Sequence, residues 1–468
     1  MKLIVLCLIT ALFAGCAVYA PKHLDTARTA AAFESRTLDA PGLRNFLEKN
    51  LRHEITPWPP TSWDLPTLTL TAFYYHPDLD TARASWGVAE AGKITAGQRP
   101  DPSIGFTPQH HSDTAGGTLS PWSLGFNLDI PIETAGKRGY RILQAEKRSD
   151  AARLHIADAA WRVRSRLESS LCDLYAEMEA EPLLQRQEAA QAEVVSLLEA
   201  RLAAGEASLP DVTRSRLALE RIRLLKMEAR KRLAQSRVAL ASALGVPKEA
   251  VDGLDISFGF IDAPFPLPAA GELRRQALTN RPDILALLSD YEAAEAALRL
   301  EIAAQYPDLR LGPGYQWDQG DDVWSIGFSV TLPVFNRNRG PIAQAQARRE
   351  EAAARFAALQ ARVSGEVDQA LAGYRALLDK LATADAALAA QRTARNSVEA
   401  LFEAGETDRL ALAGASLEME SSALDRLEAL SGVLRARGVL EDALQRPLPL
   451  SELLPADVEA NPRPEKED

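Results

Sequence analysis

The sequence predicts a mainly α-helical chain with membrane-type β-hairpins, built from two copies of one structural unit. A strand of strictly alternating apolar and polar residues occurs at 122–131 and returns about 200 residues later at 324–333. Long stretches rich in Ala, Leu, Glu, Arg and Gln follow these strands, over 139–245 and 340–446. Solenoid repeats are only about 20–50 residues long, so each copy is a whole module and the two should pack side by side.

The N-terminus has the pattern of an exported protein. Lys2 precedes an apolar run over residues 3–14, and small residues lead up to Cys16. This pattern predicts a lipoprotein signal peptide over 1–15 and a lipid anchor on Cys16. Simple cleavage after Ala20 is the alternative, although Pro21 would then follow the cut.

Prolines and changes in composition divide the rest of the chain. Residues 16–63 include Pro57, Pro59 and Pro60 and are expected to be irregular. The first repeat is expected at 64–245, with an opening helix, a β-hairpin at 102–132 and a helical hairpin at 139–245. After a linker at 246–268, the second repeat is expected at 269–446, with an opening helix, a β-hairpin at 308–333 and a helical hairpin at 340–446. Residues 447–468 should form a flexible tail.

The strands are expected to cross a membrane. Trp122, Leu124 and Phe126 alternate with Ser123 and Gly125, and a half-buried strand of a soluble sandwich gives the same pattern. A length of about nine to eleven residues also suits a tilted membrane crossing, with the apolar residues towards lipid. Four strands cannot close a barrel, and an open edge in lipid leaves backbone groups unpaired. A membrane-spanning chain would therefore have to form oligomers.

The helical stretches are expected to fold back as antiparallel pairs. Leu410, Leu417 and Leu424 recur at the seven-residue spacing of a coiled-coil seam. Gly205 and Gly405 follow the first long helix of each repeat, and Gly takes the left-handed conformation that ends a helix. A second helix begins at once, so each repeat should contain a helical hairpin with a short turn at its tip.

Composition and motifs exclude several function classes. A formal charge of −11 argues against nucleic acid as a partner. The sequence has no phosphate-binding glycine loop, no cysteine-rich zinc pattern and no nucleophile with its base, so we predict no enzyme, no cofactor and no resident metal. His110 and His111, with Asp113, are residue types that bind metals, but adjacent histidines on an exposed hairpin are usually solvated.

The order of these elements and several local motifs carry a family resemblance. Over 64–446 the chain resembles the TolC-like outer-membrane efflux proteins, including the turn Asn280–Asp283 and the glycine-tipped hairpins. The segments Ile132–Gly139 and Leu332–Gly340, which lead from strand to helix, are similar to signatures of the heavy-metal, CzcC-like subgroup.

The resemblance implies a passive export channel. Three chains would form a homotrimer with a 12-stranded barrel in the lipid of the cell outer membrane and a helical tunnel extending into the periplasm. The tunnel would dock onto a periplasmic adaptor (membrane fusion) protein that serves an inner-membrane RND pump, and the cargo would be divalent heavy-metal cations. A drug or solvent efflux channel, a type I protein-secretion channel, and a periplasmic coiled-coil scaffold without a pore are the alternatives.

The hairpin tips are the predicted functional site. The residues expected to dock the adaptor are Leu202, Gly205, Leu209, Val212, Phe402, Gly405 and Leu410. The acidic residues expected at a gate are Glu206, Asp211, Glu406 and Asp408, because acidic side chains at a constriction favour cations. The alternative role for these acids is simply to stabilise helix N-termini. Some family members place two carboxylates just beyond the second tip, where this chain has Ala411 and Gly414.

Overall fold

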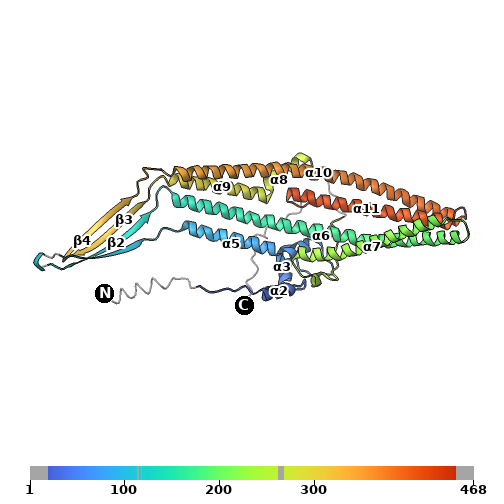
Figure 1. Ribbon diagram of the computed structural model, residues 1–468, viewed down its shortest axis with the longest axis horizontal. Coiled ribbons are helices and arrows are strands. Elements are labelled where there is room, and N and C mark those ends of the chain that lie inside the picture. The colour runs from blue at the N-terminus through green and yellow to red at the C-terminus, as the bar shows by residue number, and fades with distance from the viewer. Residues whose placement is uncertain (1–18, 113–114, 118, 262–267, 449–468) are drawn as a thin grey trace.

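The computed structural model describes residues 19–112, 115–117, 119–261 and 268–448. The molecule is elongated, with a β-sheet at one end and two helical hairpin tips at the other (Figure 1). The long helices lie roughly along the axis that connects these two ends. Within the described residues, no helix has both the length and the apolar composition that a membrane crossing needs.

One antiparallel sheet contains a hairpin from each repeat. Its strands are β1 (Ser103–His110), β2 (Trp122–Ile132), β3 (Leu309–Asp318) and β4 (Asp321–Val330), and they lie in that order. The central pairing joins the two repeats, with Phe126 opposite Tyr315 and Ile132 opposite Leu309. The outer edges of β1 and β4 have no partner strand among the described residues.

Each hairpin of the sheet leads into a long helix that returns at its tip. The first repeat has α6 (Lys137–Ala203, 67 residues) and α7 (Leu209–Leu244), and the second has α10 (Arg339–Glu403, 65 residues) and α11 (Arg409–Leu444). At 1.5 Å per residue, α6 and α10 are each roughly 100 Å long. The residues before them, Gly136 and Asn338, both have positive φ, so the same backbone bend starts each long helix.

Each repeat opens with two helices where the sequence predicted one. These are α4 (Leu65–Tyr75) and α5 (Pro77–Gly97) in the first repeat, and α8 (Ala270–Asn280) and α9 (Pro282–Ala303) in the second. Proline separates each pair because it lacks an N–H and pushes the preceding residue out of the helical region. His76 and Arg281, the residues before the two prolines, are accordingly extended. The second member of each pair packs against α6, and α9 also contacts α10 (Figure 1).

The N-terminal segment, which the sequence predicted to be irregular, is partly helical. It contains α2 (Thr26–Glu34), which Asp25 caps, and α3 (Pro41–Leu51). Leu43 and Leu47 of α3 are completely buried, four residues apart on one face of the helix. The later prolines had obscured this short amphipathic helix, which needs the neighbouring α4 to bury its apolar face.

The linker between the repeats is packed against both of them. It begins with a 3₁₀ turn (Lys248–Val251), and then Asp255 and Ser257 exchange backbone hydrogen bonds with Trp63, each 2.9 Å long. Phe258 and Phe260 contact the small cluster formed by Cys172, Ile261 and Leu434. Cys172 is buried, and burial raises the pKa of its thiol to about 12, so it is an inert core residue.

Arginine–carboxylate pairs join the repeats along α6 and α11. At mid-length Arg164, Glu168, Arg437 and Glu441 form a buried network, with Arg164 Nη1 2.8 Å from Glu441 Oε2 and Arg437 Nη2 2.9 Å from Glu168 Oε1. Further pairs follow towards the tips: Arg435 with Asp173, Arg186 with Glu420, Arg409 with Glu193, and Arg201 with Asp408. The two helical hairpins are thus tied to each other along their length.

Candidate functional site

The sheet has one apolar and one polar face. Residues opposite one another in an antiparallel sheet point to the same side, so Phe106, Phe126, Tyr315 and Trp324 form one row. Ile104, Trp324 and Phe328 on this face are each about four-fifths exposed in the single chain. An apolar face this open requires an apolar environment, which the lipid of a membrane supplies.

The opposite face carries mostly small and polar side chains, together with the apolar Val323. Its members are Ser103, Gly105, Thr107 and Gln109 of β1, Ser123, Gly125, Asn127 and Asp129 of β2, Arg310, Gly312, Gly314, Gln316 and Asp318 of β3, and Asp321, Val323, Ser325, Gly327 and Ser329 of β4. Arg310 Nη1 binds Asp129 Oδ2 at 2.6 Å across the junction of the repeats. This face is suited to line an aqueous path.

The two adjacent histidines do not converge. His110 lies on the apolar side, where its ring centroid is 4.9 Å from that of Trp122. His111 turns the other way, and its Nε2 is 2.8 Å from the hydroxyl of Ser123, which donates in turn to Asp318. Asp113 lies outside the described residues. Within the described part of the chain, no group of three or more His, Cys, Asp or Glu side chains is placed to hold a metal ion.

The helical hairpin tips have the same backbone geometry in both repeats. Gly205 and Gly405 have φ of 77° and 76°. The amide of Gly205 donates to Leu202 O at 3.0 Å and that of Glu206 to Arg201 O at 2.8 Å, and the second tip repeats both bonds at the same distances. This pair of bonds closes a helix whose next residue is left-handed, which explains the glycines. No other atoms lie within 4 Å of a Cβ built on either glycine.

Two of the predicted gate acids start the returning helices. Asp408 caps α11 by accepting from the amide of Ala411 at 2.9 Å, and Ser208 caps α7 by accepting from the amide of Asp211 at 3.4 Å. The Ala411 amide, together with the Arg201 guanidinium, lowers the pKa of Asp408. Glu206 and Glu406 are different: both are exposed, and neither has an ion pair among the described residues. They are the acids most available to a passing cation.

The two tips are joined by ion pairs that sequence reasoning missed. Arg201 at the first tip binds Asp408 at the second, and Arg409 Nε lies 2.6 Å from Glu193 Oε1. The partners are 207 and 216 residues apart, so no local sequence pattern predicts these ion pairs. These pairs hold the tips in register with each other.

Most of the predicted docking residues reach the surface of the tips, and one does not. Gly205 and Gly405 are exposed, Leu209 is 62% exposed, and Leu202, Phe402 and Leu410 are half-buried. Val212 is only 1% exposed and packs inside the first hairpin. Its prediction as a docking residue was wrong, because a side chain this deeply buried offers no surface to a partner protein. Cys16, the predicted lipid anchor, lies outside the described residues.

The chain thus combines an amphipathic four-stranded sheet with two helical hairpins whose longer helices are each roughly 100 Å long. The family described as "Outer membrane efflux protein" matches residues 61–246 and 273–444. The chain belongs to this family, which confirms the family predicted from the sequence. Because the members of the family are efflux proteins, the prediction that the chain is not an enzyme is also confirmed.

Individual relatives place the chain more closely. It is 29% identical over 215 residues to the cobalt-zinc-cadmium resistance protein CzcC of Cupriavidus metallidurans, a match that covers 46% of this chain and 50% of that protein. The match thus spans about half the length of this relative, and it supports the heavy-metal subgroup predicted from the strand-to-helix motifs.

Solved structures share the fold. They include CusC (18% identity, covering 81% of this chain and 91% of that one), VceC from Vibrio cholerae (20%, covering 81% and 96%) and the outer-membrane channel OprN (20%, covering 92% and 98%), each with a TM-score of 0.65. The predicted TolC-like fold, mainly helical with membrane-type β-hairpins, is confirmed.

Proposed function

We propose that this chain is the outer-membrane channel of a tripartite efflux system and acts as a passive conduit. The observation that carries the proposal is the amphipathic sheet, whose outer strands β1 and β4 each have an edge with no partner strand in the described part of the chain. Three copies would pair these edges and close a 12-stranded barrel, with the apolar face in lipid and the polar face around the pore. The helical hairpins would extend the conduit into the periplasm.

The tips are the proposed contact with a periplasmic adaptor, which would connect the channel to an inner-membrane RND pump. Gly205, Gly405 and Leu209 are exposed there, and the identical turns offer three copies of two similar contacts in a homotrimer. Energy would enter at the pump, and this chain would serve only as the conduit. A lipid on Cys16 would add a second attachment to the outer membrane, because one acyl chain alone binds a membrane only marginally.

The proposed cargo is a divalent heavy-metal cation. The similarity to a cobalt-zinc-cadmium resistance protein supports this class of cargo. The carboxylates of Glu206 and Glu406, which are exposed and have no ion pair with a described residue, also suit a cation path at the tips. Drug or solvent efflux and type I protein secretion use the same architecture and remain the alternatives.

Growth of a strain lacking this protein tests the cargo. The strain is grown in graded zinc, cobalt, cadmium and nickel, and beside dyes and detergents, while cell-associated metal is assayed. Metal-selective sensitivity with raised cell metal supports heavy-metal export. Sensitivity to organic compounds alone would contradict the metal cargo and leave the channel in place.

The native mass of the purified protein in detergent tests the channel separately. A heat-labile trimer from outer membranes supports it. A soluble monomer would contradict it and favour the periplasmic scaffold.

A further inference from the structure

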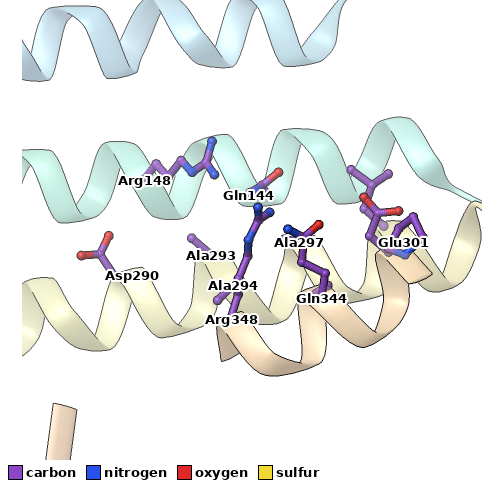
Figure 2. Close-up of a pocket in the computed structure, with 12 residues that line it drawn as sticks. Gln144, Arg148, Asp290, Ala293, Ala294, Ala297, Glu301, Gln344 and Arg348 are labelled. Carbon is purple, nitrogen blue, oxygen red and sulfur yellow. The ribbon is translucent and has the colours of Figure 1, made fainter. Parts of the chain in front are cut away.

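A polar cavity lies between the repeats, close to the strand end of the helices. It has a volume of about 300 Å³ and lies between α6, α9 and α10 (Figure 2). The cavity is near the first turns of α6 and α10 and the last turns of α9, so it sits where the helices meet the strands. Because Gln144 is seven residues after Lys137, the cavity begins roughly 10 Å from the start of α6.

The same motif from each repeat lines this cavity. Residues 142–148 read Ile-Leu-Gln-Ala-Glu-Lys-Arg and residues 342–348 read Ile-Ala-Gln-Ala-Gln-Ala-Arg. Gln144 and Arg148 thus correspond to Gln344 and Arg348, and all four line the cavity. Figure 2 shows the side chains of Arg148 and Arg348 pointing towards the same space beside Gln144.

The two arginines differ from the charged residues around them. Lys147 is 2.7 Å from Glu292, and Arg349 is 3.2 Å from Glu295. Arg148 and Arg348 have neither an ion pair nor a hydrogen bond among the residues that the structure describes. Two converging guanidiniums that form no ion pair or hydrogen bond with a described residue leave up to ten N–H donors for a ligand.

The floor of the cavity is small and its acidic groups are few. Ala293, Ala294 and Ala297 of α9 leave the space between the flanking helices open. Glu301 already accepts from the side-chain amide of Asn338 at 2.8 Å. Asp290 lies at the other end of the cavity (Figure 2). The guanidiniums of Arg148 and Arg348 lie between these two carboxylates, so the middle of the cavity is suited to an anion.

We propose that Arg148 and Arg348, with Gln144 and Gln344, bind a phosphate group at the junction of helices and strands. Planar guanidiniums bind phosphate oxygens in a bidentate manner, and the glutamine amides add neutral donors. The group is either free phosphate or the headgroup of a phospholipid, because both present phosphate oxygens and the junction of helices and strands would lie near the headgroup layer of the membrane. The site is independent of the tips and of the cargo.

The test uses the full-length protein purified in detergent. Titration calorimetry with inorganic phosphate measures the free anion, and native mass spectrometry counts the phospholipids that co-purify with the protein. In Arg148→Gln and Arg348→Gln, whichever form binds should be lost: phosphate affinity should fall about 10- to 100-fold, or retained lipid should drop. Both arginines are exposed and have no ion pair with a described residue, so these variants should keep the fold.

Two further variants provide the controls. Arg349→Gln removes a neighbouring charge that is already paired with Glu295, and it should leave both readouts unchanged. Asp290→Asn removes the negative charge from the cavity and should tighten phosphate binding a few-fold. A loss of phosphate binding identifies the free anion, and a loss of retained lipid identifies the headgroup. If neither readout responds to Arg148→Gln and Arg348→Gln, or if Arg349→Gln responds equally, the proposal is overturned.

Discussion

Arg164 and Glu441 come from different repeats, yet their guanidinium and carboxylate are 2.8 Å apart in the interior. Both side chains are more than nine-tenths buried. Burial, and then the neighbouring carboxylate of Glu168, raise the pKa of Glu441 to about 8, although the Arg164 guanidinium opposes this rise. A network of this kind fixes the register of α6 against α11, because any slip would leave buried charges without partners.

Arg164→Met should therefore destabilise the protein strongly. The substitution leaves Glu168 and Glu441 short of a buried counter-charge, which costs about 3–5 kcal/mol. Denaturant unfolding of the purified protein measures the change in the free energy of unfolding.

Arg162→Met is the matched control on the same helix. Arg162 is 63% exposed and pairs with Asp158 at 3.3 Å, so its loss should cost less than about 1 kcal/mol. Equal effects of the two substitutions would show that the buried network does not stabilise the joint.

The junction of α4 and α5 should make stability fall in mild acid. His76 is 4% exposed; burial lowers the pKa of its imidazole, and the Arg166 and Arg36 guanidiniums lower it further, against Asp78 and Asp80. The folded chain thus holds fewer protons at this site than the unfolded chain. Its full contribution to stability is present above about pH 6.5 and declines as pH falls from there towards the lowered pKa of the folded state.

His76→Asn removes this titration and keeps a polar side chain able to accept from the amide of Asp78. Unfolding free energies measured between pH 7.5 and 5 should decline less steeply in the variant than in the natural protein. His53→Asn, at an exposed position, should keep the natural slope. Identical slopes for His76→Asn and the natural protein would rule out His76 as the source.

Local patterns made the elements of this fold predictable. The period of two along 122–131 fixes which side chains share a face of the sheet, whatever the rest of the chain does. Gly205 and Gly405 mark the tips because their backbone conformation disfavours other residues. Both features depend only on residues a few positions apart.

The rest depends on contacts that the order of residues does not contain. Val212 carries the same apolar signal as Leu209, and only the position of the neighbouring helix makes one buried and the other exposed. The sequence predicts Asp408 as a gate acid, but it does not predict the ion pair of Asp408 with Arg201 of the other repeat. The helices α5 and α9 begin at prolines and have weak amphipathic patterns. Their packing against α6 is a contact between distant segments, which the local sequence does not predict.

Bulky residues at the tips should stop export without disturbing assembly. Gly205→Trp and Gly405→Trp would project a large side chain into space where no other atoms lie within 4 Å. The left-handed backbone adds a strain of roughly 1–2 kcal/mol, too little to unfold hairpins of this size. Metal sensitivity of complemented cells and the native mass of the purified protein give the two readouts.

Gly205→Asn and Gly405→Asn separate docking from strain, because Asn tolerates the left-handed conformation and is small. These variants should retain export. Loss of export in the Asn variants as well would indicate that the turn itself, and not the exposed surface, is being disturbed. Normal export in the Trp variants would argue against an adaptor contact at the tips.

The two faces of β4 should respond in opposite ways to the same charge. Ile326 lies near the middle of the strand on the apolar face and is 71% exposed, whereas Ser325 lies on the polar face. An arginine facing lipid at mid-depth costs about 2–4 kcal/mol per chain, and three chains would incur it together. Ile326→Arg should therefore reduce the protein recovered in outer membranes and its heat-labile trimer, and Ser325→Arg should alter neither. Similar recovery of both variants would mean that the apolar face does not contact lipid, and the β1 and β4 edges would then need another partner.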